Sequence, residues 1–184
     1  MNIKEEWKIY PAFRHWFQKG NIYVLSDPHF ADPDCKKMDP LWIDPVEQLD
    51  RIRRKLRKDD TCLCLGDTGN LTYIHKIQAA KKILVRGNHD DVDESYVNQF
   101  DEIYDGPVFV CEHLLLSHEP VYGLSWCLNL HGHLHSHVPH PREEENHVNL
   151  AANVWGYEPA LLAEFLDRMV KTEYETVHLT LKDQ

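Results

Sequence analysis

Five short apolar runs along this chain are each followed closely by one or two Asp, Asn or His residues. The runs are residues 21–26, 61–65, 82–85, 113–117 and 128–131, and each has the length and composition of a strand. The polar residues that follow them are, in chain order, Asp27 and His29, Asp67, Asn88 and His89, His118, and His133 and His135. In open α/β sheets, sites form in the loops beyond the carboxyl ends of the strands. The pattern therefore predicts that these side chains converge on one site.

Helical patterns alternate with strands in the first half of the chain only. Residues 45–58 predict a helix, because Asp44 can cap its amino end and Pro45 suits its first position. A second helix is expected over residues 71–81. The second half adds short strands at 108–111 and 148–151, then a helix at 159–170 and a strand at 176–181. This order predicts an α/β fold in which two packed sheets carry outer helices. No repeat or low-complexity linker divides the sequence, so we expect one domain over residues 1–184.

The composition is that of a globular domain, with 42% hydrophobic and 27% charged residues among 184. No apolar run is long enough to cross a bilayer, and the first residues lack the apolar core of a secretory signal. We therefore expect a cytoplasmic protein with no membrane partner. The formal net charge of −10 repels a long phosphate backbone, so no stable nucleic-acid partner is expected either. No sequence feature indicates an oligomeric state.

The five cysteines form no CxxC pair, which argues against both a disulfide framework and a thiolate zinc site. Cys62 and Cys64 alternate along a strand-like run and are interpreted as small buried hydrophobic residues.

The first 20 residues are rich in aromatic side chains. They include Trp7, Tyr10, Phe13, Trp16 and Phe17. We interpret this segment as packing cover for the domain, and a lid that faces the substrate is the alternative.

Histidine is unusually frequent, with 13 in the chain, and it is the commonest ligand of transition metals. The densest group is the run from His131 to His137. Taking this segment as extended, we expect His133 and His135 to lie on opposite faces, so that two ions could each take one of them. A solvated, histidine-rich loop is the alternative interpretation.

In this order, the motifs resemble those of the calcineurin-like metallophosphoesterase superfamily, whose pattern runs D-x-H, GD, GNH-D/E, H and GH-x-H. The resemblance spans Asp27 to His135. Residues 116–120 and 149–159 also look like segments of the small bacterial and phage members. The resemblance implies a four-layer α/β/β/α sandwich and an enzyme that hydrolyses a phosphate ester by attack of a hydroxide bridging two metal ions.

Carried over residue by residue, the resemblance implies two sets of metal ligands that share one carboxylate. One ion would be held by Asp27, His29, Asp67 and His135, and the other by Asp67, Asn88, His118 and His133. A carboxylate has two oxygens, so Asp67 can bridge two ions. Nitrogen and oxygen ligands without thiolate favour Mn²⁺, Fe or Zn²⁺. His89 corresponds to the catalytic histidine, which would donate a hydrogen bond or a proton to the leaving oxygen.

The sequence departs from the protein phosphatase branch of the superfamily after Asp67. That branch continues GDxxDRG, whereas Asn70 and Leu71 stand here in place of the second Asp and the Arg. Asn70 becomes the candidate partner of the His89 ring. A phosphodiesterase or a nonspecific phosphatase is favoured over a protein phosphatase, with a substrate of nucleotide type as one option.

Two alternatives stay open. The first is a phosphomonoesterase that acts on a small metabolite or a nucleotide, and the second is a non-catalytic metal-binding scaffold of the same fold. A metallo-β-lactamase-like hydrolase is disfavoured, because His133-Leu134-His135-Ser136-His137 lacks the Asp-His end of HxHxDH. Arg86 is interpreted as part of an ion pair at a strand end rather than as a contact with substrate.

Overall fold

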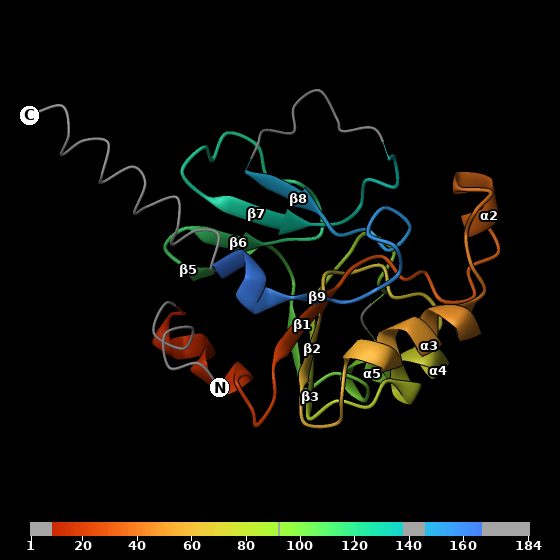
Figure 1. Ribbon diagram of the computed structural model, residues 1–184, viewed down its shortest axis with the longest axis horizontal. Helices are drawn as coiled ribbons and strands as arrows, with labels where there is room; N and C mark the ends of the chain where they lie inside the picture. The colour runs from red at the N-terminus through yellow and green to blue at the C-terminus, as the bar shows by residue number, and fades with distance from the viewer. Residues whose placement is uncertain (1–8, 92, 138–145, 167–184) are drawn as a thin grey trace, which may run out of the picture.

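The computed structural model describes residues 9–91, 93–137 and 146–166. Two β-sheets pack against each other, and helices cover the outer face of one of them (Figure 1). Each sheet contains parallel and antiparallel neighbours, which confirms the predicted α/β fold of two mixed sheets with helices. None of the helices in these residues is both long and apolar enough to cross a membrane. The single domain over residues 1–184 stays a prediction.

The first sheet has the strand order β4-β3-β2-β1-β9. Its strands are β1 (Ile22–Leu25), β2 (Thr61–Cys64), β3 (Lys81–Val85), β4 (Glu102–Tyr104) and β9 (Ala160–Leu161). The first four run parallel, and β9 pairs antiparallel with β1. The carboxyl ends of β1, β2 and β3 therefore meet at one edge, as the sequence predicted.

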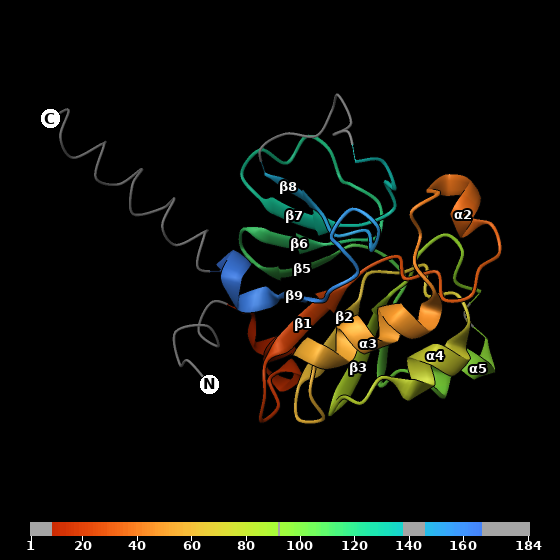
Figure 2. The ribbon, with the colours of Figure 1, turned by 45° about the vertical axis from the view of Figure 1, so that its right-hand side comes forward.

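The helices α3 (Pro45–Lys55), α4 (Leu71–Lys76) and α5 (Glu94–Val97) lie on the outer face of the first sheet, as Figure 2 shows. Asp44 caps α3 as expected, because its side chain accepts a hydrogen bond from the backbone of Val46 at 2.7 Å. A further short helix, α2 (Cys35–Met38), projects from the loop between β1 and α3.

The second sheet has the strand order β5-β6-β7-β8. Its strands are β5 (Val108–Cys111), β6 (Leu114–Leu116), β7 (Leu128–His131) and β8 (His147–Asn149). Strand β6 pairs antiparallel with β5 and parallel with β7, which pairs parallel with β8. The carboxyl ends of β6 and β7 thus face the same way, which places His118 and the histidines after β7 together.

The main core lies between the two sheets. Leu63 from the first sheet and Val110, Leu116 and Leu130 from the second are completely buried. Trp16, in the 3-10 helix η1 (Pro11–Trp16), is also completely buried against this core. For the described part of the aromatic segment, this contact confirms the interpretation as packing cover; Trp7 lies outside the described residues.

Several elements differ from the sequence expectation in length. Helix α4 ends at Lys76 rather than at residue 81, because Ile77 is extended and packs into the core under the helices. At residue 160 a short strand forms in place of the expected helix start, since Ala160 pairs with Val24 of β1. Helical backbone follows over residues 162–166. The rest of that helix and the expected strand at 176–181 lie outside the described residues.

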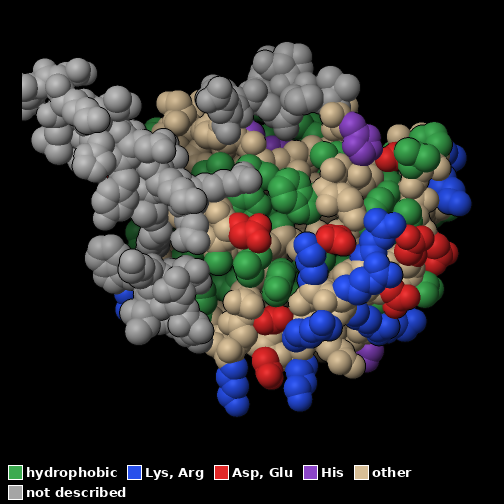
Figure 3. All heavy atoms as spheres, viewed as in Figure 1, with side chains coloured by type: hydrophobic (Ala, Val, Ile, Leu, Met, Phe, Trp, Pro, Cys, Tyr) green, Lys and Arg blue, Asp and Glu red, His purple; other side chains and the backbone are tan. Residues whose placement is uncertain are grey.

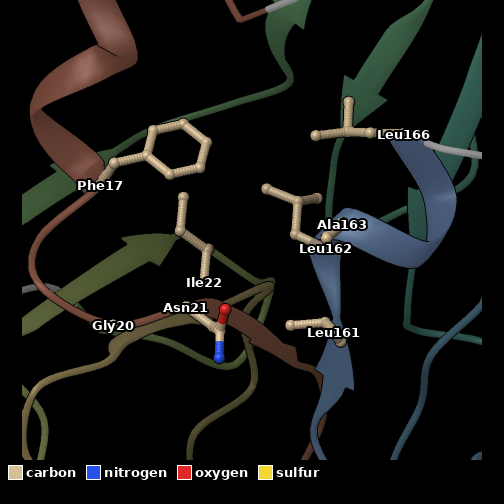
Figure 4. A pocket seen from close by; sticks show the side chains of 8 residues that line it. All are labelled: Phe17, Gly20, Asn21, Ile22, Leu161, Leu162, Ala163 and Leu166. Carbon is tan, nitrogen blue, oxygen red and sulfur yellow. The ribbon is translucent and has the colours of Figure 1, made fainter. Parts of the chain in front are cut away.

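A small cleft lies at the amino end of β1, between the end of η1 and the segment that follows β9 (Figure 4). Phe17, Ile22, Leu162 and Leu166 give it apolar walls. Asn21 and Ile22 in its lining stand at the start of β1, whereas Asp27 and His29 follow the end of this strand, so the cleft lies at the opposite end of β1 from them. It is therefore separate from the predicted site.

On the face of the molecule that Figure 3 shows, Lys and Arg gather around α3, where they lie among acidic side chains. Arg51 pairs with Glu47 at 2.7 Å, and Lys55 pairs with Glu158 at 2.8 Å. Basic residues in the last turn of a helix also interact favourably with the negative end of its dipole. These charges are explained by the helix itself. All five cysteines are free and buried, and the burial of Cys62 and Cys64 was expected from their alternation along a strand.

Candidate metal centre

The predicted site residues follow the carboxyl ends of strands from both sheets. Asp27 and His29 follow β1, Asp67 follows β2, Asn88 and His89 follow β3, His118 follows β6, and His133 and His135 follow β7. The structure brings them together, which confirms the predicted convergence. The predicted residues form two groups, and in each group one potential ligand atom per residue lies within 4.8 Å of the others. A third group of this kind, His29, Asp32 and Cys35, shares His29 with the first.

The backbone of these loops takes uncommon conformations. Asp27, His29, Asp67 and His133 all have positive φ angles, between 39° and 65°. Such angles are rare outside glycine and tend to cluster at functional sites. At Gly132 a Cβ atom would collide with the Asp27 carboxylate, so only glycine lets this loop approach so closely.

The expectation that His133 and His135 lie on opposite faces of an extended segment is wrong, because residues two apart on extended backbone share a face. The backbone is also not extended at His133, whose φ is 65°. The backbone turns there because the His133 N–H donates to the Asp27 carboxylate at 3.0 Å. The two rings nevertheless belong to different groups of the site.

The first group contains Asp27, His29 and His135. Asp27 is completely buried, and His135 Nε2 lies 3.7 Å from its Oδ1 atom. The hydroxyl of Ser26 donates to the other carboxylate oxygen. Burial raises the pKa of Asp27 to about 7, and the neighbouring His118 and the hydrogen bonds oppose this rise. Burial also lowers the pKa of His29 and of His135, which favours the neutral rings that metal binding requires.

The second group contains Asp67, His118 and His133. His118 Nε2 lies 3.3 Å from Asp67 Oδ2, and burial lowers the pKa of His133. Asn88 belongs with this group, because its Oδ1 atom lies 2.8 Å from His118 Nε2 and 3.0 Å from His133 Nδ1. A carbonyl oxygen and ring nitrogens thus face a common centre.

Asp67 lies between the two groups. Its Oδ2 atom is 3.5 Å from His29 Nε2 in the first group and 3.3 Å from His118 Nε2 in the second. Its other oxygen accepts a hydrogen bond from the backbone of His89 at 2.8 Å. Of the predicted ligands, Asp67 therefore has the geometry of a shared one.

The donor atoms fit a pair of divalent transition-metal ions. His29 Nε2 is buried and makes no hydrogen bond, although it lies 3.5 Å from Asp67 Oδ2. An unsatisfied buried group of this kind costs roughly 1–3 kcal/mol. An ion bound at this nitrogen would remove that cost, and the mixed set of nitrogen and oxygen donors suits Mn²⁺, Fe or Zn²⁺.

The far nitrogens of two buried rings are held from outside the groups. His118 Nδ1 lies 2.9 Å from the carbonyl oxygen of Leu65, and His29 Nδ1 lies 3.3 Å from Asp32 Oδ2. Partners of this type fix the orientation of a ligand ring and leave its other nitrogen free for an ion.

Asp90 is a structural residue of the site that the sequence reasoning gave no role. Its side chain is buried and accepts hydrogen bonds from the backbone N–H groups of Asp67, Thr68 and Gly87, at 2.8, 2.9 and 2.9 Å. The carboxylate thereby ties the loop after β2 to the loop after β3. The only signal in the sequence was its place in the motif Gly87-Asn88-His89-Asp90.

His89 lies beside the two groups and belongs to neither of them. Its ring centroid is 5.5 Å from that of His29, and the residue is exposed. Asn70, the expected partner of this ring, instead caps α4 by accepting a hydrogen bond from the backbone of Thr72 at 2.9 Å. Among the described residues, no hydrogen bond joins Asn70 to His89.

Arg86 forms an ion pair near the end of β3, the role that the sequence favoured over a contact with substrate. Its Nε atom donates to the carbonyl oxygen of Asp90 at 3.0 Å, and its guanidinium lies 3.8 Å from Asp105. The side chain therefore supports the loop after β3.

Comparison with known proteins agrees with this geometry. The sequence model of the calcineurin-like phosphoesterase family matches residues 20–168. A crystal structure of AQ665 from Aquifex aeolicus, a protein of unknown function, is similar with a TM-score of 0.65 at 25% identity, covering 80% of this chain and 98% of that one. The nuclease MPE of Pseudomonas putida is similar with a TM-score of 0.45 at 21% identity, covering 65% and 64%. No curated protein matches.

The family match covers every strand that carries a predicted site residue, from β1 to β7. It also extends over most of the chain. The chain belongs to the calcineurin-like phosphoesterase family.

Proposed function

We propose that this chain is a metal-dependent hydrolase of phosphate esters, with phosphodiesters as its preferred substrates. The observation that carries the proposal is the place of Asp67, one of whose oxygens lies within 3.5 Å of a histidine nitrogen in each group. Membership of a family of phosphoesterases supports the same reaction class.

We assign the ligands according to the two groups. Asp27, His29 and His135 would hold one ion, and His118, His133 and Asn88 the other, with Asp67 shared. When bound, the two ions supply Lewis acidity at the phosphoryl oxygens and activate water for attack. Two ionised aspartates leave a pair of divalent ions with net positive charge, which attracts a phosphate to an otherwise acidic protein.

His89 is the proposed general acid. Its backbone N–H donates a hydrogen bond to Asp67 Oδ1, and its exposed ring lies next to the ring of His29 at the edge of the groups. From there the ring can donate a proton to the leaving oxygen without being an ion ligand. Asn70 does not contribute a negative charge beside it, and no Arg stands at position 71 to grip a phosphate through two hydrogen bonds.

Asn70 and Leu71, in place of the Asp and Arg of the protein phosphatase branch, favour a phosphodiester substrate, which carries one negative charge fewer than a monoester. A phosphomonoesterase acting on a small metabolite or nucleotide is the second candidate. We propose a nucleotide-type ester as the substrate and a cytoplasmic location, in line with the sequence expectations.

The test compares an aryl phosphodiester with the matching aryl phosphomonoester, using chelated protein and protein reloaded with Mn²⁺. We expect hydrolysis only after reloading, with the larger kcat/KM for the diester. A larger kcat/KM for the monoester would select the second candidate. Reloaded protein that binds two ions and hydrolyses neither ester would support a non-catalytic scaffold.

A further inference from the structure

The Nδ1 side of the His135 ring forms a hydrogen bond with the buried side-chain amide of Asn153, which lies 18 residues further along the chain. Asn153 is 5% exposed, and its Oδ1 atom lies 3.1 Å from His135 Nδ1. Its Nδ2 atom donates to the carbonyl oxygen of His135 at 2.8 Å and to Asp39 Oδ2 at 3.1 Å. The amide is therefore held at both ends.

These contacts determine which way the amide points. Both neighbours of Nδ2 are acceptors, a carbonyl and a carboxylate, so the nitrogen must face them. The oxygen must then face His135 Nδ1, and an oxygen can only accept a hydrogen bond. His135 therefore carries its proton on Nδ1, and its lone pair is on Nε2. This Nε2 atom is the one that lies 3.7 Å from Asp27.

The segment that carries Asn153 is fixed to the core. Ala151 forms a bridge with Ser26, next to Asp27, and Ala152 is buried in a small cluster with Trp42. Trp42 in turn lies against the rings of His135 and His29, with centroid distances of 5.6 and 6.0 Å. The amide is thus presented by a packed support rather than by an exposed loop tip.

We propose that Asn153 is a positioning residue for His135: it fixes the tautomer and orientation of the ring so that Nε2 can bind an ion beside Asp27. Asp39 assists by holding the amide nitrogen. The proposal rests on the proposed function for its purpose, but the tautomer of His135 can be measured without any ion. Outer partners of this kind are typically worth ~10–100-fold in metal affinity.

The first experiment reads the His135 tautomer in chelated, full-length protein by long-range ¹H–¹⁵N NMR. We expect the Nδ1–H form in the wild type, because Asn153 Oδ1 accepts from Nδ1. In Asn153→Ala the ring should populate the Nε2–H form as well. A wild-type ring protonated on Nε2 would overturn the proposal directly, even if the alanine variant fails to fold.

The second experiment titrates the same proteins with Mn²⁺ alone. Asn153→Ala should weaken one of two binding events by ~10–100-fold and leave the other within a few-fold. The matched control is Asn149→Ala. Asn149 lies on the same segment and donates to the Leu134 carbonyl at 2.6 Å, and its Oδ1 atom accepts from the backbone of Ala151 rather than from the His135 ring. We expect this control to keep the tautomer and both affinities.

Equal losses of Mn²⁺ affinity in Asn153→Ala and Asn149→Ala would show that the loop backbone matters and the ring contact does not, which overturns the proposal. An unchanged tautomer together with unchanged affinity in Asn153→Ala would do the same. If the wild type binds no ion, the proposed function fails, whereas the NMR comparison still decides whether Asn153 sets the tautomer.

Discussion

His118 Nε2 lies 3.3 Å from Asp67 Oδ2, and both side chains are buried. Burial lowers the pKa of His118, but the hydrogen bond to Asp67 and the charges of Asp27 and Asp67 outweigh it and raise this pKa to about 9. A ring nitrogen that binds an ion must be unprotonated. A proton and a metal ion therefore compete for the same atom of His118.

This competition predicts opposite pH trends for metal affinity and for stability. His118 and Asp27 both have folded-state pKa values above their ordinary ones, about 9 and about 7. Each group stabilises the chelated protein at low pH, and this contribution is lost as pH rises through its folded pKa. The chelated protein should thus lose the contribution of Asp27 between pH 3.8 and about 7 and that of His118 between pH 6.5 and about 9, while Mn²⁺ affinity increases. Thermal unfolding and calorimetric titration check both trends. A Mn²⁺ affinity independent of pH between 7 and 9 would argue against the competition.

Asp67→Asn should impair turnover more than His29→Ala or His118→Ala. Only Asp67 lies against histidines of both groups, so its change weakens both ions at once. We expect kcat to fall by more than ~10²-fold, beyond the usual cost of losing an outer partner. Steady-state kinetics on the diester, with bound metal measured in parallel, provide the check. Near-normal turnover with two ions bound would show that Asp67 is not shared.

His89→Ala should keep both ions and lose catalysis. General acid assistance is typically worth ~10²–10⁴-fold, so a loss in that range is expected for an ester with a poor leaving group. The loss should shrink for an activated aryl ester, because a good leaving group needs little protonation. His75→Ala, an exposed histidine of α4, is the matched control. Equal losses for both esters would contradict the acid role, and loss of an ion would place His89 among the ligands.

Asn70→Ala should act on stability, because Asn70 caps α4 through Thr72. Loss of such a cap costs about 1 kcal/mol of unfolding free energy. Asn70→Asp should retain the stability, since Asp caps as well as Asn does. Denaturant unfolding of the three proteins measures this. If Asn70→Asp instead moves the alkaline limb of the pH–rate profile upward, Asn70 lies close enough to His89 to change its pKa.

The convergence of the site was predictable because it follows from strand direction alone. Parallel strands place their carboxyl ends at one edge, so Asp27, Asp67 and Asn88 meet whatever the details of their loops. The division of His133 and His135 between two groups followed from the resemblance. The turn that achieves it did not, because it depends on one hydrogen bond from His133 to Asp27.

The residues that support the site from the loops were harder to predict, because their roles depend on individual hydrogen bonds. Asp90, Asn70 and Asn153 are polar residues in loops, and sequence periodicity says nothing about which hydrogen bonds such residues form. Asn70 illustrates the difficulty, since its place in the motif suggested a partner for His89 and the structure gives it a helix to cap. Strands β4 and β9, of three and two residues, are too short to show a period.

The central claim is that Asp67 joins two groups of side chains that each bind a metal ion. Elemental analysis tests it most directly, on protein that has been chelated, reloaded with Mn²⁺ and freed of excess ion. The account predicts about two Mn²⁺ per chain, in the same preparation that hydrolyses the diester. A preparation that hydrolyses the diester while holding no metal would contradict it.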